Sequence, residues 1–247
     1  METIISTQNR LVKLARSLAQ RKFRALNGLF LVEGVNLLRD MPTSVVPEFV
    51  FTTKERATEA EKMFGSREGS RMYLVSDAVM ESIADTATPY GIVAVCKLPS
   101  VEFALPHGNA LLLDGVSDPG NIGTILRTAA ACDFCEVYAL DTADIYSPKV
   151  IRATLGGIFK VRVCEVNEEQ ALSLVGGTDS AVLDMDGECL LNGKVQGPIL
   201  FVAGSEAHGV RDSIKKAAKR VYSLPMKNQI ESLNVAVATA VAMYQTV

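Results

Sequence analysis

Residues 111–132 read LLLDGVSDPGNIGTILRTAAAC and join a hydrophobic run, a glycine-containing loop and a helix-like segment. Asn121 and Arg127 follow the loop. A strand, a glycine-rich turn and a helix start can bind nucleotides, because the first backbone N–H groups of a helix attract negative charge. The stretch therefore predicts a ligand site, and Arg127 is the side chain in it best suited to chemistry.

The glycine spacing of this loop differs from the Rossmann fingerprint. That fingerprint requires G-x-G-x-x-G directly after the strand and an acidic residue about 20 positions later. Gly115, Gly120 and Gly123 are five and three positions apart, and two polar side chains and Pro119 occupy the helix start. Asp141 would be the acidic residue. A nicotinamide-type oxidoreductase therefore stays an alternative function.

The hydrophobic runs around the loop predict a mostly parallel sheet covered by helices. Strands are expected in LLLD, EVYALD, KVRVCEV, AVLDM, ILFVAG and VYSL. Strands this apolar are typical of parallel sheets buried on both faces, and ligands of such sheets bind beyond the carboxyl ends of the strands. Residues 115–121, 204–209 and 224–232 are therefore expected at one edge of the sheet.

Residues 1–98 predict a smaller α/β domain, because strand-like runs such as LFLVEG and EFVFTT alternate with helical segments. Leu11, Leu14 and Leu18 recur at helical spacing, and Ser6 or Thr7 is the expected cap of this first helix. Residues 99–109 contain prolines and no clear period, which predicts a linker. The second domain is expected over residues 110–247.

The first 40 residues are basic although the whole chain has a net charge of −3. They contain seven basic and three acidic residues. This asymmetry is expected of a domain that contacts phosphates, and a solvated helix face is the alternative interpretation. The candidate nucleic-acid-binding residues are Arg10, Lys13, Arg16, Arg21, Lys22 and Arg24.

The composition predicts a cytoplasmic protein. No hydrophobic run approaches the ~20 residues that span a bilayer, and the N-terminus lacks the features of a signal peptide. The five cysteines are scattered, as is typical of a reducing compartment. Cys132 and Cys135 have no second ligand pair for zinc, so we predict ordinary buried thiols and no metal site.

Three segments together resemble the motifs of the SPOUT-class, SpoU or TrmH-like, RNA ribose 2'-O-methyltransferases. They are DPGNIGTILRT (118–128), FVAGSEAHGV (201–210) and LPMKNQIESLNVAVATAVAMYQ (224–245). YSPKVIRATLGGIF (146–159) is similar to the segment that follows the first motif, and the N-terminal part resembles the L30e-like substrate-binding domain of the ribosomal-RNA branch. The resemblance implies a trefoil-knotted α/β domain, bound S-adenosylmethionine, a ribosomal or transfer RNA substrate, and a homodimer.

The resemblance also implies roles for individual residues. Arg127 would activate the ribose 2'-hydroxyl, either as a base or by stabilising the oxyanion; an arginine is effectively always protonated, which favours the second role. Its companions in the catalytic centre would be Asn121, Glu206, Ser232 and Asn234. The cofactor-binding residues would be Gly204, Gly209, Leu224, Met226 and Leu233. Asn121 is also a candidate helix cap, and Ser232 is the expected cap of the last helix.

Methyl transfer from a sulfonium to a hydroxyl is an in-line displacement that needs positioning and oxyanion stabilisation but no metal. The last helix is apolar nearly all round, so one face is expected against the sheet and another at a dimer contact, where Ala236, Ala238, Ala240 and Ala242 would allow close approach. A non-catalytic RNA-binding assembly factor is the remaining alternative.

Overall fold

The hydrophobic runs form the strands of two separate sheets in the computed structural model, which describes residues 1–247. The chain divides into two compact units. Unit 1 contains Met1–Ser100 and Tyr146–Gly156, and unit 2 contains Val101–Ile145 and Gly157–Val247. The predicted class, a small N-terminal α/β domain followed by an α/β domain with a mostly parallel sheet, is confirmed.

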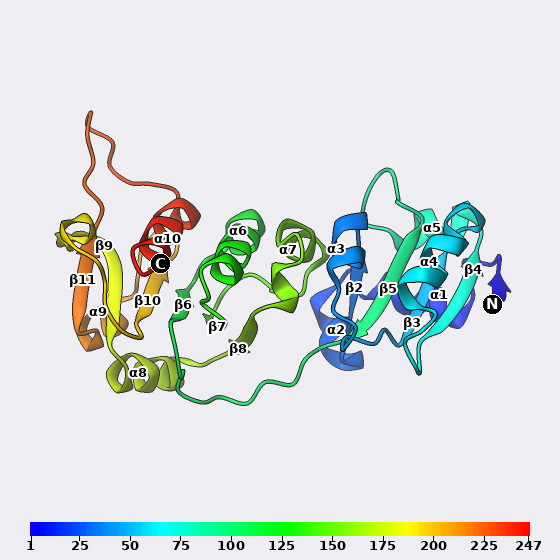
Figure 1. Ribbon diagram of the computed structural model, residues 1–247, viewed down its shortest axis with the longest axis horizontal. Coiled ribbons are helices and arrows are strands. Elements are labelled where there is room, and N and C mark those ends of the chain that lie inside the picture. The colour runs from blue at the N-terminus through cyan, green and yellow to red at the C-terminus, as the bar shows by residue number, and fades with distance from the viewer. The chain divides into compact units, whose positions relative to one another are not determined.

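Unit 1 has a five-stranded sheet in the order β1-β4-β3-β5-β2 (Figure 1). Strands β1, β4 and β3 run parallel, whereas β5 is antiparallel to both β3 and β2. The strands are β1 (Glu2–Ile4), β2 (Leu29–Glu33), β3 (Phe49–Thr52), β4 (Arg71–Val75) and β5 (Ile92–Lys97). The helices are α1 (Arg10–Ser17), α2 (Arg21–Asn27), α3 (Val35–Asp40), η1 (Lys54–Arg56), α4 (Ala57–Phe64), α5 (Asp77–Ile83) and α7 (Pro148–Ala153).

One expectation about unit 1 is wrong, and two elements were not expected. The cap of α1 is Asn9, whose side chain accepts a hydrogen bond from the Leu11 amide, and not Ser6 or Thr7. Strand β1 and helix α2 were not expected, because the first is only three residues long and the second has no clear apolar stripe. Gly28 ends α2 in the left-handed conformation, as glycine commonly does after a helix.

Unit 2 has a six-stranded sheet in the order β11-β9-β10-β6-β7-β8, and every neighbouring pair is parallel. The strands are β6 (Ala110–Asp114), β7 (Glu136–Leu140), β8 (Arg162–Glu165), β9 (Ser180–Cys189), β10 (Leu200–Gly204) and β11 (Arg220–Ser223). The helices are α6 (Pro119–Ala131), η2 (Gly157–Phe159), α8 (Glu168–Gly177), η3 (Leu190–Asn192), α9 (Asp212–Ala217) and α10 (Val235–Tyr244).

The two central strands of this sheet, β6 and β10, are buried along their whole length, as their unbroken hydrophobicity predicts. They are direct neighbours, so the loops that follow them begin side by side at the carboxyl edge. Helices α6 and α10 pack together on the sheet, and α8 packs with α9 (Figure 1). The C-x-x-C prediction is half correct, because Cys132 is buried but Cys135 is exposed.

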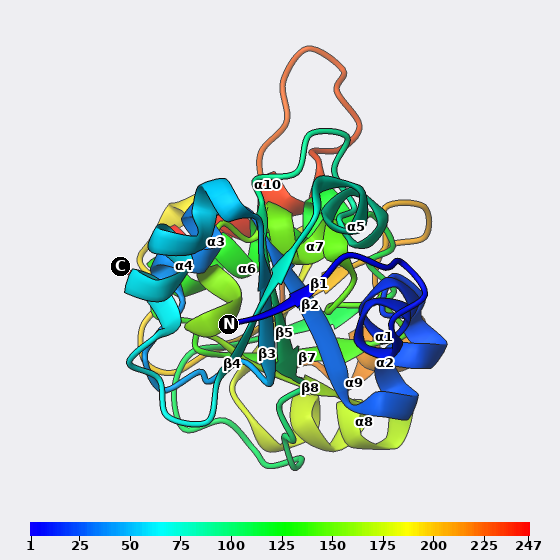
Figure 2. The ribbon, with the colours of Figure 1, turned by 90° about the vertical axis from the view of Figure 1, so that its right-hand side faces the viewer.

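The segment between β11 and α10 contains no helix or strand from Leu224 to Asn234. Most of its residues are exposed, and in Figures 1 and 2 this orange segment projects away from the sheet before it enters α10. The last helix begins at Val235, capped by the side chain of Asn234, so the predicted cap Ser232 is wrong. None of the helices is long and apolar enough to span a bilayer.

Candidate active site

Glu206, in the loop after β10, is the centre of a polar cluster at the carboxyl edge of the sheet. One carboxylate oxygen accepts hydrogen bonds from the backbone amide and the hydroxyl of Ser117, both at 3.2 Å. The other oxygen accepts from the Asp118 amide at 3.2 Å and from Asn121 Nδ2 at 2.8 Å. The second motif is therefore bound directly to the loop and helix start of the first.

The hydrogen bonds around Glu206 favour its ionised form. Burial opposes ionisation and by itself raises the pKa of a carboxyl group. The bonds from Asn121 and from the backbone amides of Glu206, Ser117 and Asp118 outweigh burial and lower the pKa of Glu206 to about 2. Glu206 is therefore ionised at neutral pH.

Asn121 and Asn234 extend this cluster to the third motif. Asn234 Nδ2 donates to Asn121 Oδ1 at 2.8 Å. Asn234 Oδ1 simultaneously accepts from the Ala236 and Val237 amides and so caps α10. A continuous chain, Asn234 to Asn121 to Glu206, thus joins the three sequence motifs through side-chain amides.

Asn121 is oriented by the local structure of α6. The expectation that Asn121 caps this helix is wrong. The cap is Asp118, whose side chain accepts a hydrogen bond from the backbone N–H of Asn121, and Pro119 is at the first helical position. The fixed φ of a proline suits that position. Asn121 is consequently free to use its side chain between Glu206 and Asn234.

Arg127 is exposed on α6 and makes no hydrogen bond or ion pair. Glu206, a predicted companion in the catalytic centre, is bound to Ser117, Asp118 and Asn121 and not to Arg127. Arg127 therefore presents a free guanidinium to solvent, which suits a group that would meet an anionic substrate.

Ser232 is exposed in the segment before α10 and makes no hydrogen bond. Three of the predicted cofactor-binding residues lie on the same segment, where Leu224 and Met226 are half-buried and Leu233 is exposed. The structure thus brings together Asn121, Glu206 and Asn234 but does not gather Ser232 or these three cofactor-binding candidates around them.

Gly204 and Gly209 close the loop that carries Glu206. Ser205 and Gly209 exchange backbone hydrogen bonds at 3.0 and 2.9 Å. A Cβ on Gly204 would lie 2.1 Å from the Gly209 carbonyl carbon, so glycine is required at position 204 for this close approach. Gly209 has a φ of +68°, a left-handed conformation that favours glycine, and a Cβ at this position would meet open space.

The sequence reasoning missed Arg211, which fastens the end of this loop. Its backbone N–H and Nε donate to the two carboxylate oxygens of Asp114 at 2.8 and 2.7 Å, and Nη2 donates to Asp141 at 3.0 Å. Asp114 ends β6 and is only 2% exposed. An acidic residue at the end of a fully buried strand needs a cationic partner. This rule predicts such a partner for Asp114, although it does not say which residue.

Asp141 also decides against the Rossmann interpretation. Asp141, the candidate acidic residue of that fingerprint, has its carboxylate paired with Arg211. Its backbone has a left-handed φ of 50°. No group of three or more His, Cys, Asp or Glu residues is arranged to hold a metal ion.

Five of the six predicted RNA-binding residues, Arg10, Lys13, Arg16, Arg21 and Lys22, are exposed. The prediction that Arg24 binds RNA is wrong. Its side chain is 3% exposed and donates to the Leu18 carbonyl, so it stabilises the turn between α1 and α2 and is not available at the surface.

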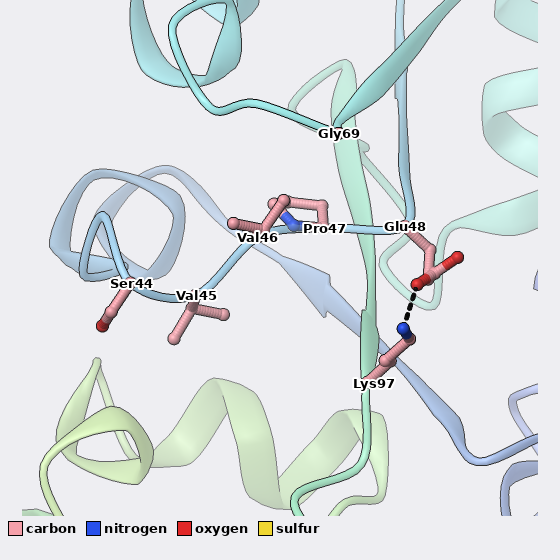
Figure 3. A pocket seen from close by; sticks show the side chains of 7 residues that line it. All are labelled: Ser44, Val45, Val46, Pro47, Glu48, Gly69 and Lys97. Atoms are coloured by element: carbon pink, nitrogen blue, oxygen red, sulfur yellow. Dashed lines mark ion pairs between the residues drawn. The ribbon is translucent and has the colours of Figure 1, made fainter.

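A hollow of about 470 Å³ lies in unit 1 (Figure 3). Its polar part is an ion pair between Glu48 and Lys97 at 2.9 Å. The lining contains none of the predicted site residues, so the hollow is no part of the polar cluster; it is formed by Ser44, Val45, Val46, Pro47, Glu48, Gly69 and Lys97.

An all-parallel α/β sheet with a polar chain at the carboxyl edge of its central strands defines a ligand-binding α/β domain. The SpoU rRNA Methylase family matches residues 108–244, and the MRM3-like substrate binding domain matches residues 9–94. The chain therefore belongs to the SpoU rRNA methylase family, which removes the oxidoreductase alternative.

Similar proteins cover almost the whole chain. The 23S rRNA (guanosine(2553)-2'-O)-methyltransferase RlmP of Bacillus subtilis is 31% identical in an alignment of 253 positions that covers 99% of this chain and 98% of RlmP. A TrmH-family RNA methyltransferase structure from Porphyromonas gingivalis has a TM-score of 0.87 and 27% identity, with 97% and 98% of the two chains covered. An AdoMet-bound rRNA methyltransferase from Sinorhizobium meliloti shares the fold, with a TM-score of 0.86, 22% identity, and 99% and 96% coverage.

Proposed function

We propose that this protein transfers a methyl group from S-adenosylmethionine to a ribose 2'-hydroxyl of ribosomal RNA. The observation that carries the proposal is the side-chain relay from Asn234 through Asn121 to Glu206, because it joins the three motifs into one site. Family membership and the ribose 2'-O activity named for the B. subtilis relative support it.

S-adenosylmethionine would supply an electrophilic methyl group on a sulfonium. The S. meliloti fold neighbour binds this donor, so the fold can accommodate it. In this chain Gly204 and Gly209 would bring main chain close to the cofactor, and Leu224, Met226 and Leu233 would line the adenine site.

Arg127 would act on the other substrate. As the methyl group passes from sulfur to the 2'-oxygen, S-adenosylhomocysteine would leave and the hydroxyl proton would pass to water or to a phosphate of the RNA. The guanidinium of Arg127 would stabilise the developing oxyanion without accepting that proton. Its lack of an internal partner supports this role. Glu206, Asn121 and Asn234 would hold the motif loops in place, and Ser232 would join them when RNA and cofactor are bound.

Residues 1–98 would bind the RNA through Arg10, Lys13, Arg16, Arg21 and Lys22, and residues 110–247 would carry out methyl transfer. The match of residues 9–94 to a substrate-binding domain supports this division. An enzyme that modifies ribosomal RNA works where ribosomes are assembled, so we place it in the cytoplasm.

The dimer would form through α10. Val237 is 49% exposed and Tyr244 is 57% exposed on this helix, although both are large and apolar or aromatic. Ala236 and Ala242, which were expected at the contact, are 3% and 0% exposed and pack within the chain itself. The face that contains Val237 and Tyr244 is therefore the better candidate.

The experiment that tests the function follows methyl transfer from radiolabelled S-adenosylmethionine to unmodified 23S rRNA. Methylation at a ribose is recognised because it blocks alkaline cleavage at that nucleotide. Titration calorimetry with S-adenosylmethionine is measured in parallel. A protein that binds RNA but neither binds the cofactor nor methylates RNA would be an assembly factor, and the proposal would be wrong.

A further inference from the structure

Residues 146–156 follow the first motif in sequence but belong to unit 1. The chain leaves unit 2 after Ile145 and returns to it at Gly157. Besides the connection after Ser100, the two units are therefore joined covalently at both ends of this segment. We call residues 146–156 the anchor segment.

The anchor segment is fastened to unit 1 at its start, middle and end. The Tyr146 ring lies 5.1 Å from the Phe30 ring of β2, measured between centroids. Arg152, on α7, donates from Nη2 to Asp85 Oδ2 at 2.7 Å. Gly156 has a φ of +93°, and a Cβ there would lie 3.1 Å from Asp40 Cβ.

The backbone of Asp85, whose carboxylate Arg152 binds, is held by the sheet of unit 1. The Asp85 amide donates to Glu33 Oε2 at 2.9 Å, and the neighbouring Thr86 hydroxyl donates to the other oxygen of Glu33. Glu33 is the last residue of β2 and is 6% exposed. A buried carboxylate with satisfied hydrogen bonds is a rigid support, so Arg152 binds to a preorganised partner.

The next residue along the chain packs against the helix of the active site. A Cβ on Gly157 would lie 2.9 Å from Arg127 Cα and 3.1 Å from the Leu126 carbonyl oxygen. One peptide bond therefore separates chain that is fastened to unit 1 from chain that contacts the backbone of Arg127.

We propose that Asp85 and Arg152 are positioning residues for methyl transfer. Their ion pair fastens the anchor segment to the RNA-binding unit and thereby connects the RNA bound by that unit to the backbone that holds Arg127. The inference rests on the proposed function. Neither residue contacts the reacting atoms; the pair sets how well the 2'-hydroxyl and Arg127 are aligned.

The test compares Asp85→Asn, Arg152→Gln and the charge-swapped double variant Asp85→Arg/Arg152→Asp. Arg39→Gln is the matched control, because Arg39 makes a similar exposed ion pair, 2.9 Å to Glu59, outside the anchor segment. Single-turnover methylation of 23S rRNA at saturating RNA should fall about tenfold or more in the single variants, since small misplacements at a reacting centre cost this much. The affinities for S-adenosylmethionine and RNA should change less than twofold, and the double variant should recover most of the rate.

A second measurement does not depend on activity. Hydrogen–deuterium exchange of the amides of residues 146–156 should increase in both single variants but not in Arg39→Gln. If the exchange changes as expected while the wild-type protein methylates no RNA, the proposed function is wrong. The conclusion that the Asp85–Arg152 pair fastens the anchor segment to unit 1 would then still hold.

Two results would overturn the inference. The first is a wild-type single-turnover rate in both single variants. The second is reduced RNA affinity with an unchanged rate, which would place the pair on the RNA-binding surface. If Arg152→Gln does not fold, Arg152→Lys gives the same comparison, because a lysine keeps the charge but lacks the planar fork.

Discussion

Replacing Glu206 by Gln should weaken the connection between the first and second motif loops. The carboxylate accepts four hydrogen bonds, two at each oxygen, from Ser117, Asp118 and Asn121. A glutamine has one acceptor oxygen, and its NH₂ group is a donor. The NH₂ group would therefore face two donors, and two of the four bonds would be lost in either orientation of the amide.

The size of the effect follows from the pKa of Glu206, which falls from 4.5 to about 2 on folding. At about 1.4 kcal/mol for each pKa unit the upper limit is roughly 3 kcal/mol. Glu206 is exposed, and solvent screening reduces such a contribution. We expect Glu206→Gln to lower the free energy of unfolding by about 1 kcal/mol at pH 7.

The pH dependence has a definite sign. Because the pKa of Glu206 is lower in the folded state, its stabilisation is fully present above pH 4.5 and is lost as the pH falls toward 2. The difference in stability between the wild type and Glu206→Gln should therefore decrease from pH 6 to pH 3.

Urea unfolding at pH 6 and pH 3 measures the difference, and Glu102→Gln is the control because Glu102 is exposed and makes no hydrogen bond. Methyl transfer at pH 7 should fall at least about tenfold in Glu206→Gln, since Asn121 loses its anchor. Equal stability of Glu206→Gln and the wild type at pH 6, together with normal methyl transfer, would refute the role given to Glu206.

Three further perturbations test other parts of the site. Arg127→Ala should nearly abolish methyl transfer while the Kd for S-adenosylmethionine stays close to that of the wild type. Arg127→Lys should recover little activity, because a point charge does not replace the planar guanidinium. Near-normal turnover of Arg127→Ala would remove Arg127 from the mechanism. Charge reversal at Lys13 and Arg16 should weaken RNA binding and make its salt dependence shallower. The slope of log affinity against log salt concentration should change by ~0.7 to 0.9 for each lost phosphate contact. An unchanged slope would mean that these two basic side chains only face solvent. Val237→Glu should dissociate the dimer at micromolar concentration in analytical ultracentrifugation, whereas a wild-type protein that is already monomeric would contradict the dimer.

The sheet of unit 2 could be predicted because its strands are uninterrupted hydrophobic runs, such as LLLD and ILFVAG. The position of the motif loops at one edge of the sheet could also be predicted, because parallel strands all end at the same edge. The pairing of Asn234 with Asn121 could not be predicted, because it depends on which polar residue caps α10, and Ser232 is equally suited by its residue type.

Other features depend on tertiary contacts that have no sequence period. Arg24 has the composition of a surface residue, but its guanidinium is buried against the Leu18 carbonyl. The anchor segment has an ordinary helical pattern, and nothing local indicates that it belongs to unit 1. The trefoil knot, which the resemblance implies, stays a prediction.

The relay from Asn234 through Asn121 to Glu206 has a consequence for folding. Its two bonds join residues 113 and 85 positions apart in the sequence. Contacts of such large sequence separation form slowly, because the entropy of closing the intervening chain is lost before the contact forms. Strands β7 to β11 lie between Asn121 and Asn234 in the sequence, so a chain that has folded only around β6 and α6 cannot possess the site. Activity should therefore appear late during refolding, after the change in circular dichroism from the first helices, and it would report completion of the fold.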